Sequence, residues 1–402
     1  MSAAAPLRVA IFGESYLPYL SGVTVSTETL ARGLGAAGHQ VLLVAPRPRN
    51  GSQPGTAGAP GPEPAYAWLP SYQGPPPAPP GYRMPLPLPS DALRAARDFA
   101  PDVVHAQSPF VSGLMARRLA QRRRVPLVFT HHTRFGDYRH YLGPLASPGA
   151  AVTAAYLRDF WRGCAGIVAP GEDLANEILA QLGDRRRPVV RTIPTGVDVA
   201  GIAGLDLIDP RAAHGWPAGS VVVAALGRLA AEKSVGELVD AFAAAVARDD
   251  HLRLLLVGGG PAEASVRERI ARPDLMGRAA LTGSLPRREA LALLRGCDLF
   301  ASASRTETQG LVVAEALACG LPVVAVDGPG VRDAVRDGRD GCLVEGTDAA
   351  ARETGLADAL VSLAADPTRR MAWADAARDG AGRFDVAARV ADVADFYREL
   401  RG

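Results

Sequence analysis

The stretch SRTETQGLVVAEALACGLPVV, which occupies residues 304 to 324, decides the fold of this chain. It follows the short apolar run Asp298–Ala301 and changes from a polar loop into an apolar segment near Gly310. Gly320, with a proline two residues later, marks the end of the helix that this segment predicts, because glycine just past a helix and a following proline both stop it. A strand, a loop, a helix and a second strand at Pro322–Val326 predict one unit of a parallel α/β sheet.

The same alternation of short apolar runs with longer amphipathic or alanine-rich segments extends along nearly the whole chain, and it predicts doubly wound parallel sheets covered by helices on both faces. In the first half, the expected strands are Leu7–Phe12, Val41–Ala45, Asp102–His105, Pro126–Thr130 and Gly166–Ala169. The expected helices between them are Thr24–Ala37, Phe110–Gln121, Ala150–Arg162 and Glu172–Leu182. In the second half, the expected strands are Val221–Leu226, Leu252–Val257, Ala279–Thr282, Asp298–Ala301 and Pro322–Val326. Its expected helices are Val235–Ala247, Ala262–Ile270, Arg287–Leu294, Leu311–Cys319 and Val331–Val335.

A pause in this pattern at Ile193–Asp198 predicts two Rossmann-like domains, which suits a chain of 402 residues because a single core rarely grows that large. We place the first domain at 1–198 and the second at 199–384. The tail 385–402 contains an amphipathic segment, Val386–Arg401, which we expect to form a helix that crosses back and packs on the first domain.

The segment 46–89 breaks the alternation, because it is crowded with proline and glycine and includes three consecutive prolines at 75–77. Proline cannot donate to a sheet ladder and favours extended conformations, and we therefore expect a long, partly stiff surface loop. The loop is either a tolerated insertion or a flap that faces a bound substrate.

The composition narrows the class of function. Hydrophobic residues make up 48% of the chain and the net charge is +2, values that indicate a globular protein and argue against a nucleic-acid footprint; no protein partner is implied. Without a CxxC motif, the four distant cysteines favour a reducing cytosol over a zinc site or a disulfide framework; they are Cys164, Cys297, Cys319 and Cys342. The run Leu7–Gly13 lacks the features of a signal peptide. Because no apolar stretch reaches the roughly 18 residues that span a bilayer, any membrane contact is expected to be peripheral.

The helix that opens near Gly310 is the first candidate for chemistry. Its N-terminus exposes unpaired backbone N–H groups and the positive end of the helix dipole, both of which suit a phosphate group. Glu307 lies in the loop before this helix, and Glu315 lies about one turn inside it. Two carboxylates in these positions can bracket a ligand that carries such a phosphate, one accepting hydrogen bonds from sugar hydroxyls and the other from a ribose. A solvated Glu315 is the simpler alternative, but an unpaired carboxylate in an apolar helix is costly.

Further motifs accompany this Glu-x7-Glu pair, which stands in the setting Ser-x-x-Glu-x-x-Gly-Leu followed by Glu-Ala-Leu-Ala-Cys-Gly-Leu-Pro-Val-Val. They are Phe12–Pro18 with Ser21–Val23, Gly38–Val41, Pro101–His105, Ile193–Asp198, Gly227–Leu229 with Glu232–Lys233, and Val257–Gly260. Together these motifs resemble family 4 of the retaining glycosyltransferases over nearly the whole chain. The resemblance implies the α/β fold called GT-B, in which two Rossmann-like domains face one another across a cleft. It also implies a retaining hexosyltransferase that uses a nucleotide-sugar donor.

By that resemblance, Arg228 and Lys233 grip the donor diphosphate from the second domain. Retaining transfer leaves charge on the departing diphosphate, and fixed cations stabilise such charge without a metal, so we expect no cofactor and no tightly bound metal. Lys233 is the only lysine, although lysine and arginine together number 44. The alternative is that Glu232 and Lys233 form a surface pair at the start of a helix.

The resemblance also supplies the remaining site residues. His132 matches the His-Thr dipeptide of the family better than His131 does, and both follow a strand at the sheet edge where open α/β sheets place their sites. The alternative is a histidine pair that caps a loop. Gly22 stands in the loop that faces the donor phosphate, where Ser21 replaces the first of two glycines that many relatives have. The predicted catalytic residues are His132, Glu307, Arg228 and Lys233. The predicted donor-binding residues are Gly22, Arg228, Lys233, Glu307, Gly310, Leu311, Val312 and Glu315.

Two runs of sequence indicate a lipid acceptor. His132–Tyr141 resembles the His-Thr-x-x-x-Asp-Tyr-x-His-Tyr run of bacterial diacylglycerol glucosyltransferases, and Thr306–Leu311 resembles the Thr-Glu-Thr-Gln-Gly-Leu variant of the same group. The resemblance implies that Asp137 and Tyr138 lie on the acceptor side. A basic cluster on and after a first-domain helix either docks on anionic headgroups or is an ordinary solvated face. Its members are Arg117, Arg118, Arg122, Arg123 and Arg124.

Three interpretations of the function follow from the sequence. The first is a cytoplasmic enzyme, peripherally associated with the inner face of the membrane, that moves a hexose from a UDP-sugar such as UDP-glucose onto a lipid such as diacylglycerol to give an α-glycosyl lipid. The second is a mannosyltransferase that acts on phosphatidylinositol or a soluble sugar acceptor. The third is a nucleotide-sugar binding protein or an epimerase that kept the GT-B frame.

Overall fold

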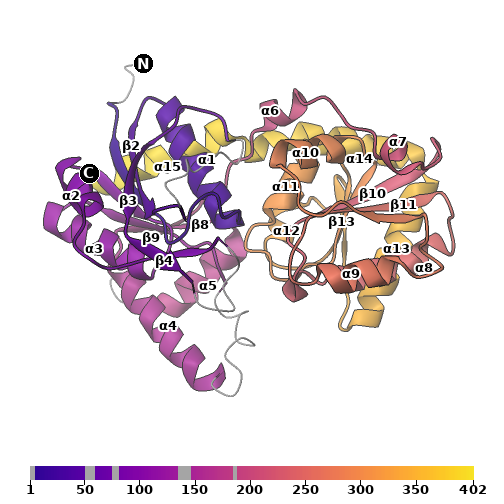
Figure 1. Cartoon of the computed structure of the whole chain (residues 1–402), viewed down its shortest axis with the longest axis horizontal. Helices are drawn as coiled ribbons and strands as arrows, with labels where there is room; N and C mark the ends of the chain where they lie inside the picture. Colours follow the sequence, from indigo (N-terminus) through magenta and orange to yellow (C-terminus); the bar gives the residue numbers. More distant parts are fainter. Residues whose placement is uncertain (1–4, 50–58, 75–80, 135–145, 184–187) are drawn as a thin grey trace. The chain divides into compact units, whose positions relative to one another are not determined.

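The computed structural model describes residues 5–49, 59–74, 81–134, 146–183 and 188–402, and of 146–150 the backbone alone. The chain divides into two compact units (Figure 1), the first formed by Met1–Gly196 together with Val386–Gly402 and the second by Val197–Asp385. The sequence placed these boundaries after residues 198 and 384. Within the described ranges, no helix combines the length and the apolar character that crossing a membrane requires.

The first unit is built on a sheet whose described strands follow the order β3-β2-β1-β6-β7-β8-β9, with every neighbouring pair parallel. These strands are β1 (Arg8–Phe12), β2 (Gln40–Pro46), β3 (Ala65–Leu69), β6 (Val103–Ala106), β7 (Leu127–Thr130), β8 (Gly166–Ala169) and β9 (Val189–Thr192). The helices of this unit are α1 (Gly22–Ala36), α2 (Asp91–Asp98), α3 (Val111–Arg123), α4 (Ala146–Arg162), α5 (Glu172–Leu182) and α15 (Val386–Arg401). The strand order reverses at β1, and open α/β sheets place ligands at the carboxyl ends of the strands at such a point.

The prediction of a surface loop over 46–89 is wrong for the part of this segment that the structure describes. β3 pairs in parallel with β2, and Ser71–Gln73 (β4) forms an antiparallel hairpin with Arg83–Pro85 (β5). The physical reason is the alternation within β3: Ala67 and Leu69 are buried on one face, while Tyr66 and Trp68 stack on each other with ring centroids 4.7 Å apart. Proline stands immediately before and after this edge strand and not within it, which preserves the ladder.

The C-terminal helix α15 belongs to the first unit, although the second unit separates the two in sequence. Its buried residues Val390, Val393 and Tyr397 recur at intervals of three or four, as one buried face of a helix requires. α15 packs closely on α1, because a Cβ atom on Gly33 of α1 would lie 2.5 Å from Val390 Cγ2. At its far end, the Tyr397 hydroxyl lies 2.5 Å from His105 Nδ1 on β6.

The second unit is built on a parallel sheet whose described strands follow the order β12-β11-β10-β13-β14-β15. These strands are β10 (Val221–Leu226), β11 (Leu252–Val257), β12 (Ala279–Leu281), β13 (Leu299–Ser302), β14 (Val323–Val326) and β15 (Gly341–Val344). The α-helices of this unit are α6 (Val199–Ala203), α7 (Pro210–His214), α8 (Val235–Val246), α9 (Glu263–Ile270), α10 (Arg287–Arg295), α11 (Leu311–Ala318), α12 (Val331–Ala334), α13 (Ala349–Ala365) and α14 (Pro367–Gly380). Its short 3-10 helices are η3 (Ala231–Lys233) and η4 (Ala381–Phe384). Here the order reverses at β10, which places the expected site of this unit at the carboxyl ends of β10 and β13.

Candidate functional site

In the second unit, predicted donor-site residues meet where β10 and β13 end. The two strands are parallel neighbours, so the loops that follow them emerge at the same edge of the sheet. Lys233, at the end of η3, donates from Nζ to Glu307 Oε1 at 2.7 Å. The hydroxyl of Thr306 donates to the backbone oxygen of Glu232 at 3.1 Å, which ties the two loops together a second time. Lys233 and Glu307 are therefore in direct contact across 74 residues of sequence.

Arg228 lies in the same loop and is paired with a different acid. Its Nη2 contacts Glu232 Oε1, and its side chain is 45% exposed. Among the described residues, Glu232 is thus the partner of Arg228, whereas Lys233 is the partner of Glu307. The arrangement differs from the alternative in which Glu232 and Lys233 form a surface pair. A partly exposed guanidinium and a partly exposed ammonium stand near the start of α11, where an anion is expected.

The start of α11 is shaped by glycine. Gly310 is the N-cap residue and has a φ of 68°, in the left-handed region that glycine adopts without strain. A Cβ atom on Gly330 would lie 2.6 Å from the backbone nitrogen of Gln309, so the loop before the helix is held against backbone. Leu311 and Val312 begin the helix and are half-buried. Since the described structure gives α11 no side-chain cap, its first N–H groups can bind a phosphate.

Glu315 is fully buried in α11, and it is paired. Arg287, the first residue of α10, contacts Glu315 Oε1 through Nη2. The side chain of Arg287 is 27% exposed while that of Glu315 is 0% exposed, so the cation reaches in from the surface. The sequence argument that an apolar helix cannot hold an unpaired carboxylate is consistent with this contact, although nothing in the sequence pointed to Arg287 as the partner.

In the first unit, the loop after β1 leads into α1 through a capping box. Ser21 Oγ accepts a hydrogen bond from the backbone N–H of Thr24 at 3.2 Å, and Thr24 Oγ1 accepts one from the backbone N–H of Ser21 at 2.8 Å. Serine in place of the glycine of many relatives therefore has a structural reason. Gly22 is the first residue of α1; it is exposed, and a Cβ atom there would meet no heavy atom within 4 Å.

The two histidines after β7 occupy different surroundings. His131 is 3% exposed and packs edge-on against Phe129 and Trp161, with ring centroids 5.5 and 5.3 Å away. His132 is half-buried, and its Nε2 lies 2.7 Å from the side-chain oxygen of Gln107. Burial lowers the pKa of His131 to about 3 and that of His132 to about 4, so both rings are neutral at ordinary pH. Of the two, only His132 combines a polar partner with partial exposure.

The predicted acceptor-side residues Asp137 and Tyr138 lie outside the described residues. The basic cluster is described: Arg117 is half-buried and donates to Asp159 at 2.9 Å, whereas its other members are exposed. Those exposed members are Arg118, Arg122, Arg123 and Arg124.

Sequence reasoning missed three residues that surround the predicted ones. Gln107 binds His132, Arg287 binds Glu315, and Ser21 caps the helix that begins at Gly22. The Ser-Gly-Val-Thr run does contain a signal for a cap, since serine is among the residues most preferred at the N-cap of a helix. No comparable signal marks Gln107 or Arg287, because each becomes a partner only through the order of strands in its sheet.

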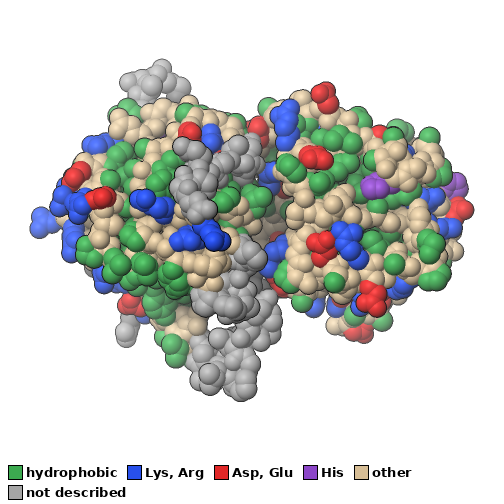
Figure 2. Space-filling view, in the orientation of Figure 1, with side chains coloured by type: hydrophobic (Ala, Val, Ile, Leu, Met, Phe, Trp, Pro, Cys, Tyr) green, Lys and Arg blue, Asp and Glu red, His purple; other side chains and the backbone are tan. Residues whose placement is uncertain are grey.

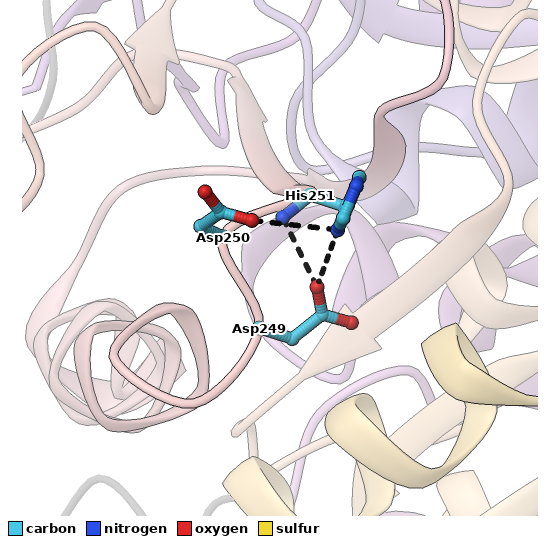
Figure 3. A group of neighbouring side chains, drawn as sticks. All are labelled: Asp249, Asp250 and His251. Atoms are coloured by element: carbon cyan, nitrogen blue, oxygen red, sulfur yellow. Dashed lines mark hydrogen bonds and ion pairs between the residues drawn. The ribbon is translucent and has the colours of Figure 1, made fainter.

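One group of side chains that commonly bind metals lies in the described part of the second unit. Figure 3 shows Asp249, Asp250 and His251, in which His251 Nδ1 lies 3.1 Å from an oxygen of Asp249 and 3.4 Å from one of Asp250. The group precedes β11, at the opposite edge of the sheet from Lys233 and Glu307. Asp249 also accepts the backbone N–H of His251 at 3.0 Å, so the ordinary geometry of an exposed turn accounts for the cluster.

Comparison with known families covers both units. Residues 20–200 match the family model described as Glycosyltransferase Family 4, and residues 209–380 match the model described as Glycosyl transferases group 1. An alpha-monoglucosyldiacylglycerol synthase of Streptococcus pneumoniae is 28% identical over 359 residues, which cover 85% of this chain and 76% of that protein. A GDP-mannose-dependent alpha-mannosyltransferase of Mycobacterium tuberculosis is 32% identical over 341 residues, which cover 84% of each chain.

Solved structures match the fold. Anabaena HepE in complex with UDP superposes with a TM-score of 0.72 at 18% identity, over 98% of this chain and 100% of that one. At this level of identity the likeness concerns the fold. Together with the two parallel sheets, it confirms the predicted α/β class with two Rossmann-like halves.

Proposed function

This chain belongs to glycosyltransferase family 4, and on that premise we propose that it transfers a hexose from a UDP-sugar, with UDP-glucose as first candidate, to a hydroxyl of a lipid such as diacylglycerol. The product is an α-glycosyl lipid. Membership makes the chain a hexosyltransferase, and a retaining outcome is consistent with this family. The interpretation as a binding protein or an epimerase is therefore set aside.

The observation that carries the lipid acceptor is the exposed face of α3. Leu114, Arg118 and Arg122 follow one another at intervals of four residues, so they lie on one side of the helix, and all three are exposed. Phe110, just before the helix, is 41% exposed and extends the apolar end of this face. The face thus presents exposed apolar side chains and basic side chains together, and both kinds of contact contribute to binding at an anionic lipid interface.

The arginine side chains at the basic end of this face are not neutralised by acidic partners within the described structure. Among the described residues, Arg118, Arg122, Arg123 and Arg124 form no ion pair with an acid, and the last three are consecutive at the end of the helix. Figure 2 shows basic side chains gathered over the part of the first unit where Figure 1 labels α2 and α3. A basic residue near an anionic membrane contributes roughly 1 kcal/mol. The likeness to synthases of alpha-monoglucosyldiacylglycerol supports the same acceptor class.

For the donor, the proposal assigns the diphosphate to the start of α11. Lys233 would exchange its contact with Glu307 for one with a phosphate oxygen, which frees the Glu307 carboxylate to accept hydrogen bonds from sugar hydroxyls. Arg228 would supply a planar second cation. Charge that develops on the departing diphosphate is then met by fixed cations and by backbone N–H groups, which lowers the barrier without further reorganisation.

A mannosyltransferase is the second candidate, because the mycobacterial relative whose name specifies GDP-mannose is 32% identical, against 28% for the pneumococcal synthase. The donor separates the two. Acceptors for this candidate are phosphatidylinositol or a soluble sugar.

The test presents the purified chain with UDP-glucose or GDP-mannose, combined in turn with diacylglycerol vesicles, phosphatidylinositol vesicles or soluble sugars. Products are identified by mass, and their anomeric configuration by proton NMR. We expect UDP release to depend on diacylglycerol vesicles and to yield a hexosyl diacylglycerol of α configuration. Vesicle binding should strengthen with anionic lipid and weaken as salt rises. Equal or faster transfer to a soluble acceptor, with no vesicle binding at low salt, would overturn the lipid acceptor and promote the second candidate.

A further inference from the structure

Gln107 and His132 form a hydrogen-bonded pair at the carboxyl edge of the first sheet. Gln107 directly follows β6, and His132 stands two residues after the neighbouring strand β7. The side-chain oxygen of Gln107 lies 2.7 Å from His132 Nε2. An amide oxygen only accepts hydrogen bonds, so the ring nitrogen must carry the hydrogen. With the amide oxygen facing the ring, the contact is satisfied by the Nε2–H tautomer of the imidazole, which leaves Nδ1 as its acceptor.

We propose that Gln107 is a positioning residue that holds His132 as the Nε2–H tautomer, so that His132 takes part in transfer as a neutral ring with Nδ1 as its hydrogen-bond acceptor. The inference rests on the proposed function, because it presupposes that His132 acts in transfer.

The frame around the pair is rigid. The backbone N–H of Gln107 donates to the backbone oxygen of Phe12 on β1 at 2.9 Å, and its side chain is 3% exposed. Two residues earlier on β6, His105 binds Thr130 of β7 through Nε2 at 2.7 Å and Tyr397 of α15 through Nδ1 at 2.5 Å. The strands that carry Gln107 and His132 are thus joined side chain to side chain, which fixes the separation of the pair.

The choice of glutamine has an electrostatic consequence. A carboxylate at this position would stabilise the imidazolium and raise the pKa of His132, whereas a neutral amide does not. The other titratable groups that face the ring are His105 on β6, and His131 and Arg134 on its own loop. Burial, and secondly the proximity of His132, lowers the pKa of His105 and of His131 to about 3. Arg134 is paired with Glu177 of α5 at 2.9 Å. Burial is the cause that lowers the pKa of His132, to about 4, so the ring beside Gln107 is neutral at ordinary pH.

The side-chain amide nitrogen of Gln107 donates no hydrogen bond to another described residue. Its Nε2 is buried without a hydrogen-bond partner there, and Gln107 lines a small cavity of the first unit together with Thr130, Thr195 and Arg389. A water molecule in that cavity is the ordinary partner of such a group.

The experiment compares Gln107→Glu and Gln107→Ala with the unaltered chain by two readouts. The first is the nitrogen NMR shift of the His132 ring in the chain without donor, which reports the tautomer whether or not the enzyme is active. We expect the Nε2–H form from pH 5.5 to 8 in the unaltered chain, and a mixture of tautomers in Gln107→Ala. In Gln107→Glu we expect the carboxylate to move the ionisation of His132 upward into that range.

The second readout is the pH profile of transfer with UDP-glucose and diacylglycerol vesicles. Since the neutral ring is the active form, Gln107→Glu should lose activity as the pH falls through the raised pKa of His132, a loss that the unaltered chain does not show. Gln107→Ala should lower kcat by roughly 10- to 100-fold, as loss of a histidine-orienting partner does, with little change in KM for the donor. Gln40→Glu and Gln40→Ala, at an exposed position on the opposite edge of the same sheet, are the matched controls.

Each possible outcome separates the positioning role of Gln107 from the proposed function. A His132 ring that carries its hydrogen on Nδ1, or whose tautomer is the same in Gln107→Ala, overturns the positioning role by itself. A fixed tautomer together with a His132→Ala variant of full activity removes His132 from transfer and overturns the inference, while the proposed function stands. A fixed tautomer in a chain that transfers no hexose to diacylglycerol vesicles is instead a failure of the proposed function. A low-pH loss in Gln40→Glu equal to that in Gln107→Glu would also overturn the inference.

Discussion

The predicted site residues of the two units are held by different kinds of interaction. In the second unit, each of the three described pairs joins a cation to a carboxylate: Lys233 with Glu307, Arg228 with Glu232, and Arg287 with Glu315. In the first unit, His132 is held by a neutral amide and backed by a buried chain of His105, Thr130 and Tyr397. The described partner of His132 is thus uncharged, whereas the three pairs of the second unit are each formed by two charged side chains.

The difference follows from what each unit is expected to bind. A diphosphate carries charge before and after transfer, and cations that stand beside its expected site need only exchange their carboxylate partners for phosphate oxygens when it arrives. A lipid hydroxyl and a hexose are neutral, and a site for them works through hydrogen bonds whose geometry is fixed. The contrast makes a general prediction: single changes of charge should matter most in the second unit, and isosteric changes of hydrogen bonding should matter most in the first.

Among the charged pairs of the second unit, we expect the largest effect from Lys233→Ala. Removing one preorganised cation from a leaving-group site should lower turnover by roughly 100- to 1000-fold. Lys233→Arg should recover part of that loss, because the guanidinium keeps the charge but places it differently. Steady-state kinetics with UDP-glucose measure both. Unaltered kinetics in a folded Lys233→Ala enzyme would remove this residue from the mechanism.

The pair of Arg287 with the fully buried Glu315 should matter first for stability. Arg287→Met leaves a buried carboxylate without its cation, which should lower the free energy of unfolding by about 3 kcal/mol. Adding Glu315→Gln removes that charge and should restore much of the loss. Urea denaturation of the two single variants and the double variant measures the coupling. Additive effects would show that the two side chains do not interact in solution.

Substitutions of the two histidines test the hydrogen-bonded site of the first unit. His132→Ala should lower transfer by roughly 10- to 100-fold, the worth of one or two well-placed hydrogen bonds. His131→Ala should change transfer less but lower thermal stability, because it opens a space between Phe129 and Trp161. Activity and melting temperature, measured on both variants, separate the roles. If His131→Ala is the inactive variant, the assignment moves one residue back.

The fold was predictable wherever a strand stood alone between polar boundaries. β10 and β11 were expected at the residues where they lie, because each is a short run of mostly buried apolar residues, interrupted in β11 only by Arg253, as is typical of a parallel strand covered on both faces. β3 was missed because prolines on both sides hid a five-residue alternation. α13 and α14 were not predicted, since alanine-rich helices without a strong apolar period give little contrast between faces.

For the candidate site, the sequence predicted several of the site residues but not the partners that hold them. Family motifs supplied Lys233 and Glu307, and the structure places them in contact. The partners Gln107 and Arg287 could not be derived from the sequence, because a residue becomes a neighbour of His132 or Glu315 only once the strand order is known. Sequence periodicity gives the strands but not their order in the sheet, and the pairs depend on that order.

Substitutions at the basic end of α3 test whether this surface of the first unit binds an anionic membrane. Replacing Arg122, Arg123 and Arg124 together by serine should weaken binding to anionic vesicles by roughly tenfold at physiological salt, because screening reduces each contribution below its value of about 1 kcal/mol. Donor affinity should not change. The matched control replaces three arginines that have acidic partners, Arg248, Arg267 and Arg398, and alters net charge equally. Equal losses in both triple variants would mean that total charge, and not this face, binds the vesicle.

Gly22→Ala is the smallest and most selective change, because the described structure gives no steric reason for glycine there. A Cβ atom would meet no heavy atom within 4 Å, and the residue begins α1 without a left-handed φ. In the free protein, alanine should therefore leave stability unchanged or raise it by up to about 0.5 kcal/mol. If the donor phosphate approaches this end of α1, the added methyl group should raise the donor KM by roughly 3- to 5-fold while kcat stays the same, as the loss of uniform binding requires. Ser21→Ala gives the opposite pattern, because it removes the cap and should cost about 1 kcal/mol of stability. A Gly22→Ala enzyme with unaltered KM would take Gly22 out of the donor site and leave the second unit as the donor's main contact.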